Sequence, residues 1–594
     1  MLKTHASRQT WLLVVMALLV LGAGLGLRDP WPSDEPRFAL VAKQMVDSGY
    51  WLFPHRGPEL YSDKPPMLMW WQAALYSLVG HWRMAFLLPS LLAALGTLWC
   101  VVDLGRRLWT RQVGLYAGWA LLFALHFTFQ AKKAQIDPLV VLFITLANYG
   151  LLRHLLLGPA WRWWWMGWFF AGIGVITKGV GVLALMMIVP AAVASMLHWP
   201  RVSLHVRDLR FWLAPLAFLL AVSLWLVPML LAGLATGSEP YRAYIDDILF
   251  RQTARRYTQS WDHHQPWWYF LAIMPSMWIP AFLLLPWALP AWFRRLRRRD
   301  ARYLLPLAWW LLVVLFFSIP HGKRDVYILP ALPMFCLALA PLLPGLLRRR
   351  DVQRVLGAFT ALLALALGLV GALALLGDPD FEVRLTHGRG LLPGATDALA
   401  WAALAMAAWS ALSLWVCGRR RRHVALVATL AGVWVLYSLV GYPVLNDSSS
   451  ARGLMREVSA RIGPQAELGL VAWKEQNLLM ADRPAATFGF EARWHQQLQA
   501  AVRWQRLVPQ HRWLLVNEDA MQACIDRAQA EMAGISNRRR WWLVPADAVA
   551  GTCRPWGGGR GAARRPGGGR RTAWGGGGPG GGGGAGGGGG GPRG

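Results

Sequence analysis

Acids and a lysine crowd into one short stretch near the N-terminus, SDEPRFALVAKQMVDSGYWLFPHRGPELYSDKPPMLMWW, which covers residues 33–71. Asp34 and Glu35 are adjacent, and Asp63 and Lys64 stand just before two prolines. A carboxylate can accept a proton from an acceptor or stabilise positive charge at the anomeric carbon of a sugar. A lysine can hold a phosphate both in the ground state and as the phosphate leaves. This set of residues therefore predicts transfer of a sugar from a lipid phosphate.

Two short helices are expected to position these groups. The segment EPRFALVAKQMVDSG forms a helix from about Pro36, which places Asp34 and Glu35 at its N-terminus. A helix N-terminus favours anions, so plain capping is the alternative interpretation of the acidic pair. The segment KPPMLMWWQAALYSLVG starts a second, apolar helix that is too short for a comfortable span. Together the helices would frame a pocket at the membrane surface that also contains Tyr61.

The composition places the rest of the chain in a membrane. Of the 594 residues, 55% are hydrophobic and only 15% are charged. Many apolar runs reach the ~20 residues that a membrane-spanning helix requires. We predict an all-α polytopic membrane protein with about thirteen transmembrane helices. The expected spans are 11–27, 84–102, 113–129, 138–156, 163–178, 180–198, 211–233, 267–290, 304–320, 327–346, 355–377, 394–417 and 424–443.

The arginines predict the orientation of these spans. Short, arginine-dense loops near residues 106–111, 201–210, 294–302, 348–350 and 419–422 alternate with the remaining loops. Such loops are typical of the cytoplasmic side, so we expect a cytoplasmic N-terminus. The net charge of +30 then reflects membrane topology, and we expect the lipid bilayer as a partner and no nucleic acid.

The opposite loops carry both signs of charge, which indicates a polar cavity. Their charged residues include Asp137, Lys178 and Lys323. Lys178 lies between two apolar runs, where a lysine is costly unless it faces water, a partner or an anion. The alternative is a lysine that extends along the apolar surface to reach water.

Three regions follow from these patterns. Residues 1–445 are expected to form the transmembrane domain, with residues 28–83 as its first outer loop. Residues 446–555 alternate expected strands, such as HRWLLVNE, with expected helices, such as EDAMQACIDRAQAEM, and predict a small α/β domain on the outer side. A disulfide between Cys524 and Cys553 is possible if that domain lies outside the cytoplasm. Residues 556–594 are rich in glycine and arginine and are expected to be disordered.

The first loop resembles that of the bacterial 4-amino-4-deoxy-L-arabinose lipid A transferases, which are kin to protein O-mannosyltransferases and have the GT-C fold. Departures from the family pattern are Ser62, where an aromatic residue is usual, and Asp63, where glutamate is usual. The shared residues are Asp34, Glu35, Arg37, Phe38, Gly49, Trp51, Tyr61, Asp63, Lys64, Pro65 and Pro66. Later matches, in the same order as in the family, are KKAQIDPLVV, ITKGVGVLAL, RQTARRYTQSWDHHQPWWYFL and FFSIPHGKRDVYILPALP.

The resemblance implies a glycosyltransferase of the bacterial inner membrane that uses a polyprenyl-phosphate sugar and inverts the anomeric carbon. The first outer loop and the C-terminal domain would then be periplasmic. It makes Asp34 the principal catalytic carboxylate, with Asp137 as a second acid and Glu35 beside Asp34. The residues expected at the donor phosphate are Lys64, Arg255, Arg256, Lys178, Lys323, Tyr61 and Tyr327. No cofactor is expected to be required, although the resemblance implies a divalent metal, such as zinc, between Asp63 and His263 or His264.

The acceptor and two other functions stay open at this point. Aminoarabinose transfer to lipid A is the activity that the resemblance favours, with another glycan or a protein as the alternative acceptor. A transporter or flippase of lipid-linked sugars should show internal repeats and interrupted helices in matching halves. A glycan ligase would also have outer basic loops, but the Asp-Glu pattern of the first loop does not suggest it.

Overall fold

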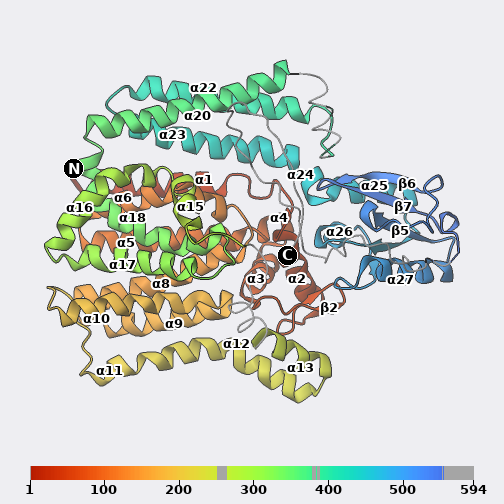
Figure 1. Ribbon diagram of the computed structural model, residues 1–594, viewed down its shortest axis with the longest axis horizontal. Coiled ribbons are helices and arrows are strands. Elements are labelled where there is room, and N and C mark those ends of the chain that lie inside the picture. The colour runs from red at the N-terminus through yellow and green to blue at the C-terminus, as the bar shows by residue number, and fades with distance from the viewer. Residues whose placement is uncertain are drawn as a thin grey trace, which may run out of the picture.

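A computed structural model describes residues 2–249, 264–377 and 390–551, together with Val383, Gly388 and Cys553. The chain forms an elongated bundle of helices with a small sheet packed against one end (Figure 1). The helices of the first half that shape the bundle are α1 (Leu2–Gly22), α2 (Glu35–Ser48), α3 (Met67–Val79), α4 (Trp82–Ala85), α5 (Leu88–Leu108), α6 (Arg111–Leu122), α7 (Leu125–Ala131), α8 (Ile136–Leu157), α9 (Trp161–Lys178), η1 (Val180–Met187), α10 (Ile188–Met196), α11 (Leu209–Trp212), α12 (Ala214–Thr236) and α13 (Glu239–Asp246).

The second half continues the bundle and adds an outer layer. Helices α20, α22 and α23 form this layer, at the top of Figure 1. The helices are α15 (Tyr269–Met277), η3 (Ala281–Leu284), α16 (Leu285–Arg297), α17 (Ala301–Ser318), η4 (Asp325–Ala331), α18 (Leu332–Leu339), η5 (Ala340–Leu342), α19 (Leu343–Leu346), α20 (Arg350–Leu376), α22 (Ala395–Cys417), α23 (Arg422–Leu436), η6 (Tyr437–Gly441) and α24 (Tyr442–Ser450).

Each of the thirteen apolar runs coincides with a helix or a broken pair of helices. Among the described residues, eight helices are long and apolar enough to cross a membrane, or ten if each of two bent pairs counts as one span. The expected number, thirteen, is therefore higher than the number that length and composition support. The difference includes the short apolar helices Arg8–Gly22 and Val180–Met196, which fall below the length of a full span. The multi-pass all-α class itself is confirmed.

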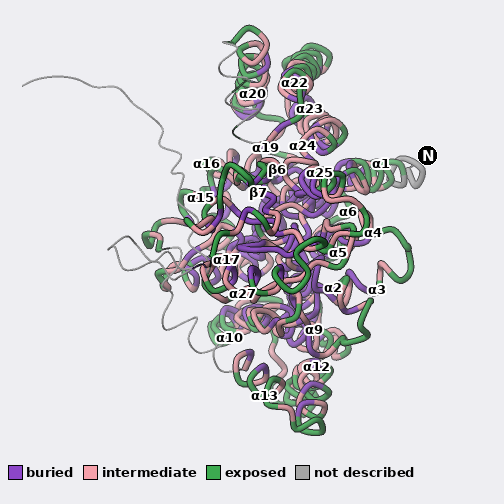
Figure 2. The backbone as a smooth tube through the Cα atoms, turned by 90° about the vertical axis from the view of Figure 1, so that its right-hand side faces the viewer, coloured by how far each residue is buried: buried purple, intermediate pink, exposed green. Residues whose placement is uncertain are grey.

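Burial separates the bundle's centre from its lipid-facing layers. Helix α8 is buried along almost all of its length. Helices α20 and α12 are buried over only a small part of theirs, and Figure 2 shows them mostly in green and pink. Glycines let the inner helices approach closely. A Cβ on Gly114 would lie 2.2 Å from the Val102 carbonyl oxygen, and one on Gly150 would lie 2.3 Å from the Trp163 carbonyl oxygen. Small residues at such crossings are typical of helix packing in membranes, where dispersion contacts drive association.

The C-terminal region is a mixed sheet with the strand order β4-β3-β5-β7-β6. Strand β3 pairs in parallel with β4 and β5, and β7 pairs antiparallel with β5 and β6. The expected small α/β region is thus confirmed. Its elements are α25 (Arg452–Ile462), β3 (Glu467–Val471), α26 (Glu475–Leu479), β4 (Ala485–Thr487), α27 (Trp494–Leu507), β5 (Arg512–Asn517), η7 (Glu518–Ala520), β6 (Glu531–Ser536), β7 (Arg539–Val544) and η8 (Ala546–Ala548).

One expected helix of this region is wrong. EDAMQACIDRAQAEM forms only the short η7 and then an irregular segment, before β6 begins at Glu531. The Cys524–Cys553 disulfide and a β-bridge between Ile525 and Val549 hold this segment against the chain that follows η8. These tertiary links override the helical propensity of the sequence.

Candidate functional site

Asp34 stands at the N-cap of α2, at the end of the bundle that faces the sheet. Its carboxylate makes no capping hydrogen bond to the described backbone, so simple capping does not account for it. Arg324, the residue just before η4, places its Nη2 atom 3.4 Å from the Asp34 Oδ2 atom. The Asp34 side chain is partly exposed. The helix N-terminus therefore presents a carboxylate that is paired on one side and accessible on the other.

Glu35, the next residue, is placed quite differently. Its buried carboxylate receives a hydrogen bond of 2.8 Å from Arg28 Nη2 and a second contact from Arg28 Nη1. The backbone amides of Trp31 and Ala134 donate to the same carboxylate at 2.8 and 2.9 Å. Charge-assisted bonds of this type are strong and fix geometry. Glu35 therefore ties the entry of α2 to the segment after α7, and its oxygens are already engaged.

Asp29 anchors the same segment to distant parts of the chain. Its carboxylate accepts two hydrogen bonds from Arg83, at 2.8 and 2.9 Å, and one from Asn446 at 2.8 Å. Arg452 pairs with it at 2.9 Å. Burial raises the pKa of Asp29, but the hydrogen bonds from Arg83 and Asn446 and the charge of Arg452 outweigh burial, and the pKa lies below its usual value. The start of the first loop is thus fastened to α4, α24 and α25.

Asp137, the second predicted acid, lies in the first turn of α8. It forms an ion pair with Lys178 at the end of α9, and the Lys178 Nζ atom lies 5.6 Å from the centre of the Tyr327 ring. Burial lowers the pKa of Arg324, but the charges of Asp34 and Asp137 more than offset it, and the pKa is raised. The two predicted carboxylates therefore both act on Arg324. The structure brings Asp34, Asp137, Lys178 and Tyr327 into one electrostatic neighbourhood.

A cavity of about 240 Å³ opens beside this group. It is lined by cations and by aromatic rings. Lys133 is one of the cations, and its Nζ atom lies 3.7 Å from the centre of the Phe129 ring. The neighbouring Lys132 donates its Nζ hydrogens to the carbonyl oxygens of Val20 and Ala23, both at 2.8 Å. The lining residues include Arg28, Trp31, Glu35, Lys133, Arg324, Asp325, Trp434, Tyr437 and Tyr442.

The residues predicted at the donor phosphate are more scattered. Tyr61 is buried, and burial raises the pKa of its hydroxyl. Lys64 is half-buried in the loop between β2 (Glu59–Leu60) and α3. Lys323 is buried and donates to the carbonyl oxygens of Gln265 and Pro320, at 3.1 and 2.6 Å. Arg255 and Arg256 lie outside the described residues.

The structure describes only part of the predicted metal site, namely Asp63 and His264. Arg56 Nη1 lies 3.8 Å from Asp63 Oδ2, and a guanidinium beside a carboxylate opposes binding of a second cation. His264 forms a β-bridge with Gly322, while His263 lies outside the described residues. Within the described part of the chain, no cluster of three or more His, Cys, Asp or Glu side chains could hold a metal ion. No step proposed below uses one.

Several residues that build the site were not among the predicted ones. Arg324 and Asp325 stand in the quoted segment HGKRDVYILP, but only the Lys and Tyr of that turn were selected. Arg28 and Asp29 stand a few residues before the first-loop stretch that begins at Ser33, and a charged pair just after an apolar run is a signal that could have found them. Asn446, 417 residues away from Asp29, carries no such signal.

The helix bundle, the carboxylate at its outer end and the appended sheet define a polytopic membrane protein of the GT-C fold. ArnT from Cupriavidus metallidurans, in its crystal structure bound to undecaprenyl phosphate, has the same fold, with a TM-score of 0.69 at 19% identity over 91% of this chain and 99% of that chain. A family model described as dolichyl-phosphate-mannose-protein mannosyltransferase matches residues 63–227.

Curated relatives narrow this class to one family. The undecaprenyl phosphate-alpha-4-amino-4-deoxy-L-arabinose arabinosyl transferase of Pseudomonas paraeruginosa is 30% identical over 456 residues, which cover 74% of this chain and 77% of that protein. The chain belongs to this family of arabinosyl transferases. The match to the relative from Pectobacterium carotovorum subsp. carotovorum, also 30% identical, spans 61% of this chain and 65% of that protein, slightly less than two thirds of its length.

Proposed function

We propose that this protein transfers a sugar from a polyprenyl-phosphate donor to an acceptor at the periplasmic face of the bacterial inner membrane. The observation that carries the proposal is the placement of Asp34, whose partly exposed carboxylate makes no capping hydrogen bond and pairs with Arg324. The charge of Asp137, which pairs with Lys178, also acts on Arg324. The specific reaction proposed is transfer of 4-amino-4-deoxy-L-arabinose to lipid A, and the names of the relatives support the choice of sugar.

The reaction is a single displacement at the anomeric carbon. The acceptor oxygen forms a bond to this carbon while the bond from the carbon to the phosphate oxygen breaks, and the polyprenyl phosphate leaves with the electron pair. If the acceptor is a hydroxyl, Asp34 takes its proton as general base. If the acceptor is a phosphate, the nucleophile is already anionic, and Asp34 instead orients groups and balances charge at the anomeric carbon.

The surrounding cations suit the anionic parts of such a reaction. Arg324 and Lys133 both line the cavity beside Asp34. Positioned cations stabilise charge on a phosphate as it leaves, and they do so more strongly where water is excluded. Lys64 is assigned to the donor phosphate from its place in the Asp-Lys-Pro-Pro segment, with Tyr61 beside it. Glu35 is assigned a positioning role, because Arg28 and two backbone amides already occupy its carboxylate.

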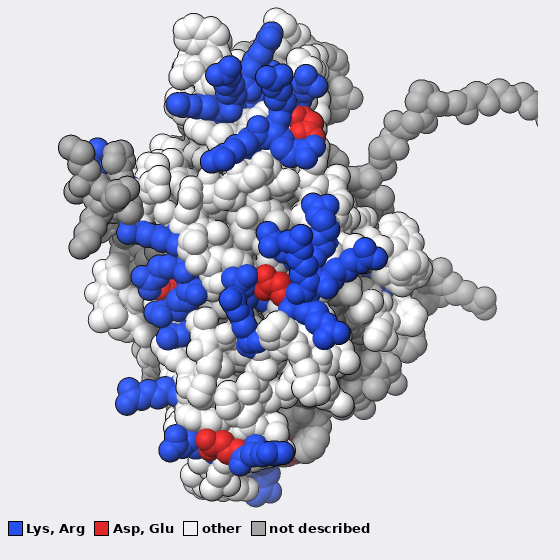
Figure 3. All heavy atoms as spheres, turned by 90° about the vertical axis from the view of Figure 1, so that its left-hand side faces the viewer, with Lys and Arg blue, Asp and Glu red and all other residues white. Residues whose placement is uncertain are grey.

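The proposed orientation places the sheet and the Asp34 end in the periplasm. Arginine-dense loops gather at the opposite end of the bundle, which Figure 3 shows as a face rich in lysine and arginine and poor in acids. Such a face is typical of the cytoplasmic side. The Cys524–Cys553 disulfide supports this orientation, because disulfides persist in oxidising compartments.

The test is a transfer assay with purified protein in lipid, using undecaprenyl-phosphate-linked aminoarabinose and lipid A. We expect lipid A to gain the mass of one pentosamine with the wild type and with Asp47→Asn, an exposed carboxylate on the same helix. Asp34→Asn should reduce the rate by about 10²- to 10⁴-fold, the usual range for loss of a general base or a comparable charged group. Full activity in Asp34→Asn would contradict the assignment of the site.

A further inference from the structure

The first loop is held against the C-terminal sheet region by a hairpin of two short strands, β1 (His55–Arg56) and β2. On one side, the Gln44 side chain on α2 bonds both the amide and the carbonyl of Gly57, at 2.9 and 3.0 Å. On the other side, a Cβ on Gly57 would lie 3.3 Å from the Trp473 ring, and Glu59 accepts a hydrogen bond of 2.8 Å from the Phe490 amide. The hairpin is therefore fixed from both sides.

Glu475 lies at the centre of this contact. It is the first residue of α26, its side chain is 5% exposed, and its Oε1 atom accepts a hydrogen bond of 3.1 Å from Arg37 Nε. Arg56 Nη1 lies 4.0 Å from the same oxygen. The Glu475 carboxylate of the sheet region thus interacts with two arginines of the first loop, and one of them, Arg56, is buried.

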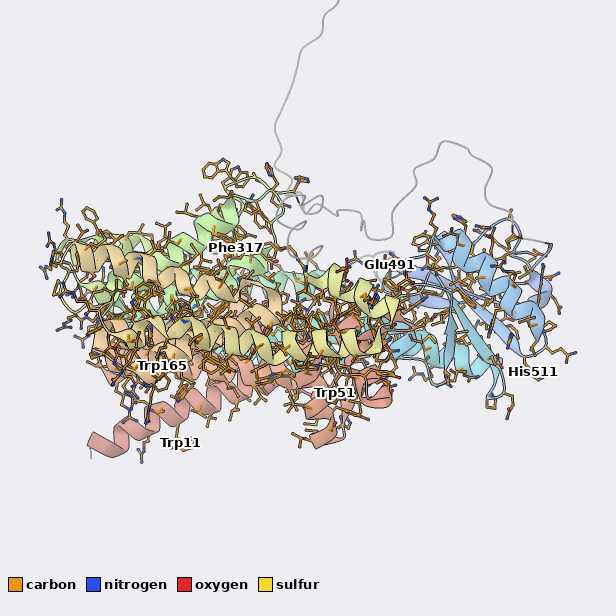
Figure 4. All side chains as sticks on the ribbon, turned by 90° about the horizontal axis from the view of Figure 1, so that it is seen from below. Trp11, Trp51, Trp165, Phe317, Glu491 and His511 are labelled. Carbon is orange, nitrogen blue, oxygen red and sulfur yellow. A yellow bond between two sulfur atoms is a disulfide. The ribbon has the colours of Figure 1, made fainter. Side chains whose placement is uncertain are left out.

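Arg56 extends the contact in two directions. Its guanidinium lies 3.8 Å from the centre of the Phe490 ring and bonds Glu491 at 2.8 Å. Figure 4 shows Glu491 where the helix bundle meets the sheet region. In the other direction, Arg56 lies 3.8 Å from Asp63, the neighbour of Lys64. The same buried arginine therefore touches the sheet region and the donor-phosphate segment.

Arg37 is the more consequential partner, because it lies on α2 only three residues after Asp34. Burial lowers the pKa of Arg37, but the electrostatic interactions with Tyr61, Glu475 and Asp34 raise it by more, and the pKa lies above its usual value. Asp34 is therefore within electrostatic range of the Arg37 guanidinium. Asp34 nevertheless forms its ion pair with Arg324. The Arg37 side chain is 28% exposed, and a guanidinium that loses its carboxylate partner is attracted to the nearest remaining anion. Asp34 is a close candidate for that anion.

We infer that Glu475 is a positioning residue for the active site: it holds Arg37 on the sheet side of α2 and so keeps the Asp34 carboxylate available beside Arg324. The C-terminal region then contributes a positioning residue to the transferase site, in addition to packing against the helix bundle. This inference rests on the proposed function for its activity test. Without Glu475, Arg37 should turn toward Asp34 and neutralise it.

The test compares Glu475→Gln and Glu475→Asp with Glu467→Gln in the full-length protein. Glu467 is a matched control on β3, exposed and paired with Arg512 at 2.7 Å. We expect kcat per folded molecule to fall on the order of ten- to hundredfold in Glu475→Gln, the size of effect that misplacement of a reacting group produces. The KM for the donor should change less than about twofold, because substrate binding keeps its own contacts. Glu467→Gln should match the wild type.

Glu475→Asp keeps the negative charge but shortens the side chain by one methylene. If Glu475→Gln does not fold, this variant still tests whether the position of the carboxylate relative to Arg37 matters. The distinguishing variant is the double substitution Arg37→Gln with Glu475→Gln. Removing the released Arg37 guanidinium should restore part of the kcat lost in Glu475→Gln. If Glu475 had only a structural role, the second substitution would not restore kcat. Wild-type kcat in Glu475→Asp and Glu475→Gln, or a double variant no faster than Glu475→Gln, would overturn the inference.

A second readout does not depend on activity. In the Glu475→Gln background, melting temperatures of Asp34→Asn, Arg37→Gln and their combination should be non-additive, because a new Asp34–Arg37 pair has formed. In the wild-type background the coupling between the same substitutions should be smaller, because Glu475 holds Arg37 on the sheet side of α2. If the wild type transfers no sugar, the proposed function fails, and this coupling still tests the position of Arg37. Equal coupling in both backgrounds would contradict it.

Discussion

At the end of the bundle that faces the sheet, charged side chains pair across long distances in the sequence, whereas at the opposite end they pair with near neighbours. Arg37–Glu475, Asp29–Arg83 and Lys178–Asp137 join separate elements, and the carboxylate of each pair is largely buried. At the other end, Arg349 pairs with Asp351 and Arg302 with Asp300, each two residues apart.

This difference separates two uses of charge in one protein. A local, exposed pair such as Arg349–Asp351 contributes little to stability. Buried pairs between distant elements are costly to form, and removing one partner leaves an uncompensated charge. At the sheet-facing end, buried pairs of this kind hold a set of carboxylates and cations in a fixed geometry around Asp34.

The largest expected effect on stability comes from breaking the buried pair of Glu35. Glu35→Gln leaves Arg28 buried without its carboxylate, which should cost about 3–5 kcal/mol of unfolding free energy. Thermal unfolding in detergent would show a large drop in melting temperature. An unchanged melting temperature would mean that the buried network does not hold this end together.

A smaller effect is expected on turnover when the second carboxylate loses its partner. Lys178→Met leaves Asp137 without its lysine, and the rate of sugar transfer should fall on the order of tenfold. Lys178→Arg should retain more activity, because it keeps the charge. The rates are measured per folded molecule, and equal rates for the wild type and Lys178→Met would remove Asp137–Lys178 from the site.

Asp29 predicts a pH dependence of stability. Its pKa is lowered in the folded protein, so its stabilising contribution is present above the unfolded value of about 4 and is lost as the pH falls through the folded pKa. Asp29→Asn should lower the melting temperature at pH 7 and flatten its decline below about pH 4. If the melting temperature of Asp29→Asn fell below pH 4 as steeply as that of the wild type, groups other than Asp29 would cause the decline.

The smallest effect is expected at the opposite end. Arg349→Gln removes an exposed pair with Asp351, and neither the melting temperature nor the transfer rate should change measurably. A loss comparable to that of Glu35→Gln would erase the contrast between the two ends.

The sequence predicted the elements better than their connections. Apolar runs predicted the helices, because a membrane requires long stretches of apolar residues, and the Asp-Glu and Asp-Lys-Pro-Pro patterns located the first loop. Neither pattern distinguishes Asp34 from Glu35. That distinction depends on Arg28 and on the Ala134 amide, and on Arg324, which lies 290 residues from Asp34. No local periodicity encodes such contacts.

The same limit explains the remaining differences. Lys323 was expected at a phosphate, but neighbouring backbone carbonyls hold its ammonium group. The helix expected around Cys524 is replaced by an irregular segment because a disulfide to Cys553 constrains it. The role of Glu475 depends on the sheet region folding back onto α2, more than 430 residues earlier in the chain.

The most direct test of the central claim is mass spectrometry of lipid A from bacteria that lack this gene and carry either the wild-type gene or Asp34→Asn. The account predicts a lipid A species heavier by one pentosamine with the wild-type gene and its absence with Asp34→Asn at equal protein level. The same species in both strains would contradict the claim that Asp34 is the centre of the transferase site.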